Sequence, residues 1–220
     1  MDMVKKGLIL MIYTVIAGLV LAGIYVMTKP SIAKADLSEK ERAMRVVLTD
    51  WKTGEKLVSD EEISKALSEG GPEKVVELSW NGVNGKVFLP VYKFHTKLGE
   101  VYVMVGAAPG FGGDVKVMAS FVKGRDGIYL NAIKVLDASQ ETPGLGAKIL
   151  QEAPQKRFWG IPPNGLKKGV VVDKDAHGRK DRGVVKTSDI MTGATITPRA
   201  VANAINIMYE YLTQKLGGEK

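Results

Sequence analysis

The sequence predicts an α+β fold, in which an N-terminal transmembrane helix precedes one domain with a central antiparallel sheet and flanking helices. Three observations support this prediction. Residues 7–27 carry no charged side chain, short β-rich runs separated by glycine turns occupy residues 74–136, and residues 198–212 have helical apolar periodicity. We therefore divide the chain into residues 1–30, a short N-terminal tail with the membrane anchor, and residues 31–220, a single folded domain.

The first predicted element is the apolar run from Gly7 to Met27. As a helix, this run would span roughly 31 Å, which is about the thickness of the hydrocarbon core of a bilayer. Lys5 and Lys6 before the run and Lys29 after it are suited to the lipid headgroups. The sequence therefore predicts a single-pass anchor in the lipid bilayer.

A cleaved signal peptide is the alternative, because Ala33-Lys34-Ala35 has the small-x-small form of a cleavage site. The apolar run is longer than the roughly 7–15 residues of a signal-peptide core, so we expect a retained anchor. Basic residues are more numerous after the run than before it, and charge counting alone therefore favours a cytoplasmic domain.

Composition excludes several kinds of site. The chain has no cysteine, which excludes disulfides, thiolate-held iron–sulfur clusters, thioether-linked haem and cysteinyl flavin. Its two histidines, His95 and His177, lie far apart, and we expect no metal site. The net charge of +7 is spread over many lysines without interleaved aromatics, which predicts a solvated basic surface and no nucleic-acid binding.

The elements of the domain follow in order along the chain. Ser38 followed by Glu41 has the form of a capping box and predicts the start of a helix. The runs VVEL, KVFLPVYKFH, EVYVMVGAA, VKVMASFV and IYLNAIKVL, separated by Asn-Gly, Leu-Gly and Asp-Gly turns, predict an antiparallel sheet. A closing helix is expected to begin at Pro198, with one apolar stripe formed by Val201, Ile205, Met208 and Leu212.

Three glycine-bearing loops interrupt this pattern, namely APGFGG (108–113), ETPGLG (141–146) and TGAT (192–195). None is a dinucleotide-binding fingerprint or a P-loop. Singly, each is typical of a turn, and both Pro143-Gly144 and Pro109-Gly110 fit the centre of a type II turn. Together, three loops that let the backbone approach a ligand closely favour a flat or phosphorylated ligand.

Two threonines near the start of the closing helix have different predicted roles. Pro198 at the first helical position places Thr197 at the N-cap, where its hydroxyl would accept a hydrogen bond from the backbone. Thr195 precedes the helix beside small residues, so that an enzyme or a ligand could reach its hydroxyl. A phosphate on Thr195 would lie near the positive end of the helix dipole and close to Arg199.

These residues carry a resemblance to a known family. The run DIMTGAT, from Asp189 to Thr195, resembles the Asp-x-x-Ser/Thr-Gly-Ala-Thr motif, in which the last threonine carries FMN through a phosphoester bond. ETPGLG and GFGG resemble the matching loops of the same FMN-binding family, and the single N-terminal span agrees with it. The family includes the G subunits of Rnf electron transport complexes, which the chain resembles most, and the C subunits of sodium-translocating NADH:quinone reductases.

The resemblance implies FMN as cofactor, linked covalently through a phosphoester to Thr195 by a separate flavin transferase. It assigns no catalytic residue. It implies that two groups of residues bind the cofactor: Asp189, Thr192, Gly193, Ala194, Thr195 and Thr197 in the first, and Glu141, Thr142, Gly144, Leu145 and Gly146 in the second.

The resemblance also implies a redox subunit of an ion-translocating ferredoxin:NAD oxidoreductase (Rnf) complex, with no independent turnover and with the other subunits as partners. It places the anchor in the inner (cytoplasmic) membrane. Contrary to the charge count, it places the N-terminal tail on the cytoplasmic side of that membrane and the FMN domain, residues 31–220, on the extracytoplasmic side. Two alternatives remain open. One is the C subunit of the quinone reductase, and the other is a cofactor-free structural or assembly protein in which residues 192–198 only start a helix.

Overall fold

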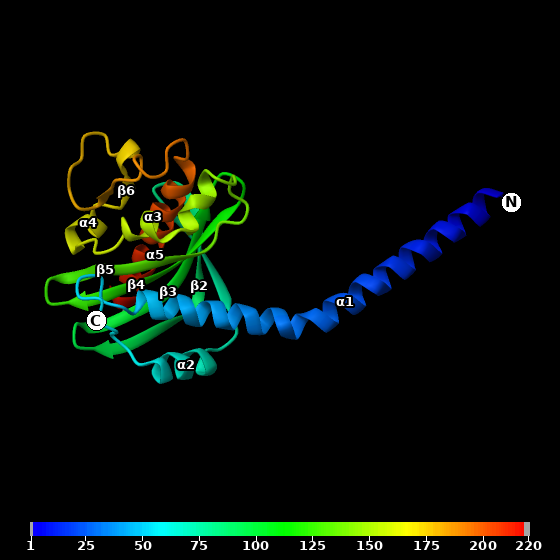
Figure 1. The fold of residues 1–220 in the computed structure, drawn as a ribbon, viewed down its shortest axis with the longest axis horizontal. Coiled ribbons are helices and arrows are strands. Elements are labelled where there is room, and N and C mark those ends of the chain that lie inside the picture. Colours follow the sequence, from blue (N-terminus) through cyan, green and yellow to red (C-terminus); the bar gives the residue numbers. More distant parts are fainter. Residues whose placement is uncertain (1, 218–220) are drawn as a thin grey trace. The chain divides into compact units, whose positions relative to one another are not determined.

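The computed structural model describes residues 2–217. Its internal contacts divide the chain into two units, one up to Lys40 and one from Glu41 onward. The first unit is the larger part of α1 (Asp2–Val47). The second contains the last turns of α1 together with the sheet and the remaining helices (Figure 1).

Helix α1 contains the predicted membrane span. It is long and apolar enough to cross a membrane, and the side chains of its charge-free segment are exposed. A helix that is apolar on all sides suits a bilayer, because the hydrocarbon covers every face of it. The predicted helix start at Ser38 is wrong, because α1 continues through this residue to Val47. The backbone there is already bonded within the helix and leaves no helix end to cap.

The predicted antiparallel sheet is confirmed. Its first connection joins Trp80 to Val83 through Asn81 and Gly82, whose φ values of 48° and 80° are those of the type I′ turn that Asn-Gly favours. Five strands pair in chain order as a meander: β1 (Lys74–Trp80), β2 (Val83–Thr96), β3 (Gly99–Pro109), β4 (Asp114–Gly124) and β5 (Gly127–Asp137).

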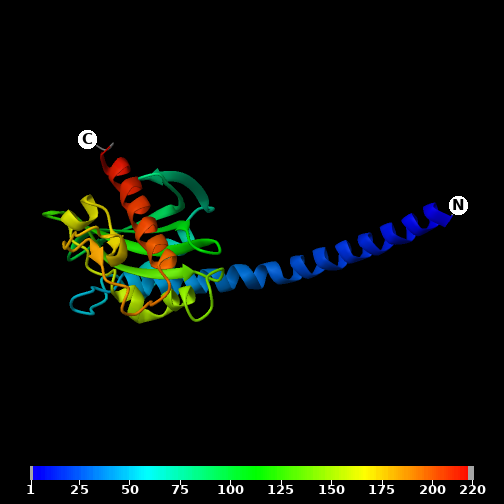
Figure 2. The same cartoon turned by 90° about the horizontal axis from the view of Figure 1, so that it is seen from above.

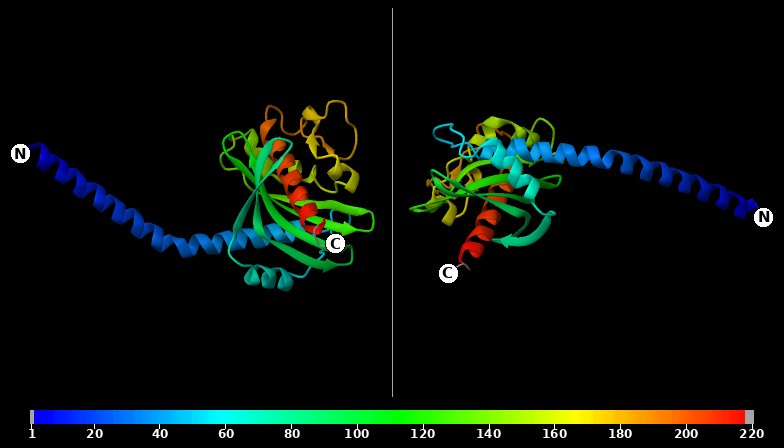
Figure 3. Two further views of the ribbon diagram at one scale, coloured as in Figure 1. Left: turned by 180° about the vertical axis from the view of Figure 1, so that it is seen from behind. Right: turned by 90° about the horizontal axis from the view of Figure 1, so that it is seen from below.

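Both faces of this sheet are covered, which explains why consecutive residues of β3 and β4 are buried. Helix α5 (Ile196–Gly217) packs on one face, and its predicted apolar stripe is fully buried (Figure 2). The end of α1 and helix α2 (Asp60–Glu69) form a second core on the other face, where Met44, Ile63 and Val103 meet (Figure 3). The domain therefore has three layers.

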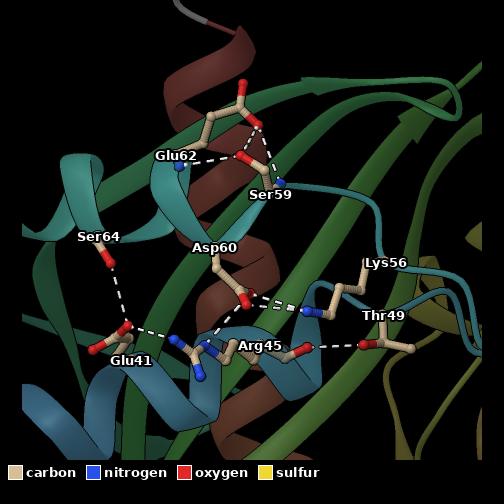
Figure 4. Close-up of polar contacts among 8 residues, drawn as sticks. All are labelled: Glu41, Arg45, Thr49, Lys56, Ser59, Asp60, Glu62 and Ser64. Atoms are coloured by element: carbon tan, nitrogen blue, oxygen red, sulfur yellow. Dashed lines mark hydrogen bonds and ion pairs between the residues drawn. The ribbon is translucent and has the colours of Figure 1, made fainter.

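Helix α2 lies in a segment for which the sequence suggested no element. It begins with a capping box, in which Ser59 accepts a hydrogen bond from the backbone of Glu62 and the Glu62 side chain accepts one from the backbone of Ser59. Asp60 in its first turn pairs with Arg45 of α1 at 3.5 Å and with Lys56 at 3.1 Å (Figure 4). These contacts fix α2 beside the end of α1.

The chain between β5 and α5 consists of short elements joined by loops, and these loops carry both predicted motifs, apart from Gly146 at the start of η1. Asn206 of α5 bonds both backbone groups of Val170, at 2.7 and 2.9 Å, and so holds this segment against the helix. The elements are η1 (Gly146–Leu150), α3 (Glu152–Lys156), α4 (Pro163–Lys167), β6 (Val171–Val172), η2 (Asp173–Asp175) and β7 (Val184–Val185). β6 and β7 pair in parallel.

The buried side chain of Asn131 on β5 fastens the end of α1 to the sheet. Its Nδ2 donates to the carbonyls of Val47 and Thr49 at 2.8 and 2.9 Å, and its Oδ1 accepts from the backbone N–H of Trp51 at 3.2 Å. The Ser120 hydroxyl also donates to the Val47 carbonyl, at 2.6 Å. Asn131 therefore satisfies backbone groups that a helix end leaves unpaired.

We expect Asn131→Ala to lower the free energy of unfolding by about 2–4 kcal/mol, because the part-buried Thr49 carbonyl and Trp51 N–H lose their side-chain partner and the Val47 carbonyl loses one of its two side-chain donors. Ser120→Ala is the control, with an expected loss of about 1 kcal/mol, because Asn131 still donates to the same carbonyl. Urea unfolding of the detergent-solubilised chain measures both losses. Equal losses for the two variants would contradict this role of Asn131.

Candidate functional site

A cavity of about 230 Å³ opens on the domain surface where the three glycine-bearing loops meet. The turn between β3 and β4, the loop after β5 and the turn before α5 each contribute to it. The structure thus brings together most of the residues predicted to bind the cofactor. The lining residues are Phe111, Glu141, Thr142, Leu145, Gly146, Gly193, Ala194, Thr195, Ile196 and Thr197.

The side chain of Glu141 joins the three loops. It is only 4% exposed, and its two carboxylate oxygens have different partners. Oε1 accepts from the backbone N–H of Phe111 at 2.7 Å, and Oε2 accepts from the hydroxyl of Thr197 in a short contact. A Cβ on Gly146 would lie 2.5 Å from Thr197 Oγ1 and 2.6 Å from Glu141 Oε2, so glycine leaves the room that this contact needs.

The prediction that Thr197 is the N-cap is wrong. Helix α5 begins at Ile196, and the carbonyl of Thr195 accepts the N–H of Arg199 at 3.3 Å, so Thr195 occupies the N-cap position. The Thr197 hydroxyl bonds to the buried carboxylate of Glu141 instead. Pro198 is accommodated because a backbone N–H in the first helical turn would have no partner within the helix.

One of the two predicted type II turns is confirmed. Gly144 has a φ of 74°, and the N–H of Leu145 donates to the Thr142 carbonyl at 3.1 Å across Pro143-Gly144. The prediction of a type II turn at Pro109-Gly110 is wrong. Gly110 lacks the positive φ that such a turn requires, and its N–H donates to the Gly113 carbonyl at 2.8 Å. A Cβ at Gly110 would instead collide with Glu141 Oε1.

The turn before α5 presents Thr195 at the cavity edge. Gly193 has a φ of 85°, which favours glycine, and the N–H of Ala194 donates to the carbonyl of the buried Met191 at 3.1 Å. A Cβ on Gly193 would lie 3.5 Å from Leu145 Cδ2, so this turn lies beside the loop after β5. Thr195 is half-buried and remains open to the cavity.

The cation nearest to this hydroxyl comes from outside the predicted motifs. Lys174 of η2 donates from Nζ to Thr195 Oγ1 at 3.0 Å. Arg199, which we expected beside a phosphate on Thr195, is instead paired with Asp175 through bonds of 2.5 and 2.7 Å. The hydrogen bonds of this pair lower the pKa of Asp175 and raise that of Arg199. Both groups therefore stay charged over the physiological pH range.

Asp173, on the other side of Lys174 in the chain, accepts the Ser188 hydroxyl in a short contact. It also accepts the backbone N–H groups of Thr187 and Ser188, at 3.2 and 3.3 Å. Burial alone would raise the pKa of Asp173, but these hydrogen bonds together lower it. The carboxylate therefore holds η2 against the start of the DIMTGAT segment.

Three predicted residues do not line the cavity. Asp189 accepts a hydrogen bond from Arg157 at 3.2 Å and lies 3.7 Å from Lys186. Thr192 is exposed and donates to the backbone, and Gly144 belongs to the exposed turn described above. Asp189, Thr192 and Gly144 are thus exposed to solvent and do not form the wall of the cavity.

Of the apolar rim of the cavity, the sequence analysis predicted Leu145 but missed Phe111 and Ile196. Phe111 is 68% exposed, and Leu145 and Ile196 are 43% and 40% exposed. Large apolar side chains left open beside a cavity mark a place for a ligand. Phe111 lies in APGFGG, where the prediction rested on the glycines alone. Nothing in the sequence pattern indicates Ile196 or Lys174. Within residues 2–217, no three side chains are grouped as metal ligands.

Comparisons with known proteins show which proteins the chain is similar to. Residues 110–210 match the family described as the FMN-binding domain, and this range contains every cavity residue. A crystal structure from Thermotoga maritima, described as an RnfG subunit of an electron transport complex, is 40% identical in sequence. The match covers 80% of this chain and 97% of that one, with a TM-score of 0.64.

Two curated relatives extend the similarity over almost the whole chain. The G subunit of an ion-translocating oxidoreductase complex from Shewanella piezotolerans is 27% identical, over 97% of this chain and 91% of the relative. The G subunit of a proton-translocating ferredoxin:NAD(+) oxidoreductase complex from Clostridium ljungdahlii is also 27% identical, over 93% of this chain and 88% of the relative.

Substitution of Glu141 tests its role in joining the loops. Glu141→Ala should lower the free energy of unfolding by about 2–3 kcal/mol, because the Phe111 N–H and the Thr197 hydroxyl lose their buried acceptor. Glu141→Gln should cost less than about 1 kcal/mol, because its carbonyl still accepts from Phe111 and its amide can donate to the Thr197 oxygen. Urea unfolding measures both values, and a Gln variant as unstable as the Ala variant would contradict the assignment.

Proposed function

The chain belongs to the RnfG family of ion-translocating oxidoreductase complexes, and on this premise we propose that it carries electrons through FMN linked covalently to Thr195. One observation carries the proposal. The half-buried hydroxyl of Thr195 lies at the edge of a cavity that both predicted motifs line, at the start of a long helix. The first backbone N–H groups of that helix favour a phosphate beside them.

The apolar rim of the cavity supports a flat aromatic ring system as the ligand. Phe111, Leu145 and Ile196 offer apolar surface to the ring, and we assign the exposed Thr142 as a hydrogen-bond partner at its edge. A cavity of about 230 Å³ is smaller than the ~300–1,000 Å³ of most small-molecule sites, so the ring would be only partly enclosed. Contacts of this kind alone would hold FMN weakly, whereas a covalent bond keeps it at a high effective concentration.

The attachment uses Thr195 as the acceptor. Its Oγ1 forms a bond to the phosphorus on the flavin side of FAD, the pyrophosphate P–O bond breaks, AMP leaves, and the hydroxyl proton passes to solvent. A separate flavin transferase would catalyse this step. The exposed surface of Asp189 and Thr192, together with Gly193 and Ala194, is the part of the motif that such an enzyme would read. Bound FMN supplies the acceptance and release of electrons.

The remaining residues of the site position the acceptor. Glu141 holds the turn that contains Phe111 and the start of α5 at fixed places, and Gly146 leaves room for its contact with Thr197. We assign Gly144 to the turn that presents Leu145 to the ring. We assign no catalytic residue, because the chain would act as a redox subunit that carries electrons and has no turnover of its own.

We further propose electron transfer between reduced ferredoxin and NAD in a complex with the other Rnf subunits, coupled to ion export. The names of the relatives support this assignment. Helix α1 would anchor the chain in the inner membrane, with the FMN domain on the extracytoplasmic side.

This orientation is tested by proteolysis. Protease added outside intact spheroplasts should digest the domain, because it would be exposed on the extracytoplasmic side, and full protection would contradict this orientation.

The attachment site is tested by substitution in cells that contain the flavin transferase. Thr195→Val keeps the side-chain shape but removes the acceptor oxygen, so flavin fluorescence should vanish from the denatured protein on a gel. Thr192→Ser is the control and should retain fluorescence, because it keeps a hydroxyl at an exposed position. The signal of the wild type should survive boiling in detergent, since only a covalent bond resists that treatment.

Two results would oppose the proposal. Fluorescence that persists in Thr195→Val would place the link on another residue. A wild-type chain without flavin, from cells that contain an active transferase, would favour the cofactor-free structural protein.

A further inference from the structure

We propose that Lys174 is a positioning residue that orients the acceptor oxygen of Thr195 and then holds the phosphate attached to it. This inference rests on the proposed function and adds a residue that neither motif contains. The observation behind it is the distance of 3.0 Å between Lys174 Nζ and Thr195 Oγ1, across 21 positions in sequence.

The segment around Lys174 is built so that this lysine reaches Thr195. Asp173 before it bonds to Ser188, which immediately precedes the DIMTGAT segment. Asp175 after it pairs with Arg199 in the first turns of α5. Each carboxylate thus ties η2 to one side of the turn that carries Thr195, and the lysine between them is presented to its hydroxyl.

The ammonium group of Lys174 keeps its charge available for a ligand. The neighbouring carboxylates of Asp173 and Asp175 are engaged by other donors, as described above. Within the described residues 2–217, Lys174 forms no ion pair with a carboxylate, whereas Arg199 is committed to Asp175. Lys174 is therefore the cation at Thr195 that an incoming phosphate can use.

The same contact serves both states of Thr195. Before transfer, the ammonium donates to one lone pair of Oγ1 and fixes the place of the oxygen. The transfer forms the Oγ1–P bond, breaks the pyrophosphate bond of FAD and releases AMP and a proton. The resulting phosphodiester carries one negative charge beside Thr195, and a lysine there forms a charge-assisted hydrogen bond with it.

The test compares flavin incorporation into the full chain in detergent, with FAD and a purified flavin transferase, at low and high ionic strength. Lys174→Gln should incorporate flavin about fivefold more slowly at low salt, since a partly exposed charge-assisted bond is lost. Lys174→Arg should restore the rate to within about twofold, because it keeps the charge. The matched control is Lys180→Gln, which removes the same charge from an exposed position nearby and should leave the rate unchanged.

Two further readouts separate a charge effect from a structural one. The deficit of Lys174→Gln should shrink at high ionic strength, because salt screens the attraction in the wild type. In fully loaded protein, the ³¹P resonance of the phosphodiester should shift in Lys174→Gln and stay in place in Lys180→Gln.

A Lys174→Gln variant with the wild-type rate and an unchanged ³¹P resonance would overturn this inference alone. Failure of Lys174→Arg to restore the rate would also overturn it, because the charge would then not be the reason. A wild-type chain that takes up no flavin would overturn the proposed function and this inference with it.

Discussion

The site depends on one buried carboxylate. Glu141 has two oxygens and places each on a different segment, the turn after β3 and the first turn of α5. A buried carboxylate is costly unless its oxygens are hydrogen-bonded, so these two contacts determine how the loops meet. The same constraint explains why positions 110 and 146 are glycines, because a Cβ at either position would collide with the carboxylate. The glycines thus serve the close packing of three loops around a shared acceptor.

The sheet gives this arrangement a rigid support. Helix α5 is held by its buried stripe and by Asn206, so its N-terminus, which Thr195 directly precedes, has a fixed place on the domain. The opposite face of the sheet is closed by the end of α1 and by α2, and Asn131 binds the α1 terminus. A hydroxyl carried on a loop at the end of a packed helix combines access with precise placement.

Local patterns predicted much of this molecule. The strands and their turns follow from β-rich runs separated by glycine, the α5 stripe from its helical period, and most cavity residues from two motifs. The misses have tertiary causes. The Thr197 hydroxyl could cap its own helix or donate to Glu141, which lies 56 positions away in sequence. The tertiary fold brings Glu141 within reach, so the second bond forms. Lys174 reaches Thr195 because Asp173 and Asp175 bind elsewhere, which no spacing in the sequence indicates. The Ser38 capping pattern failed because α1 has no end there.

The central claim is that Thr195 is the hydroxyl that this arrangement presents for a phosphate-linked flavin. Tandem mass spectrometry of the tryptic peptide 187–199 from the purified wild-type chain tests it most directly, because the peptide contains all the hydroxyls of the motif. The account predicts an FMN group, with its phosphate, on Thr195. An unmodified peptide, or the same group on Thr192 or Thr197, would contradict it.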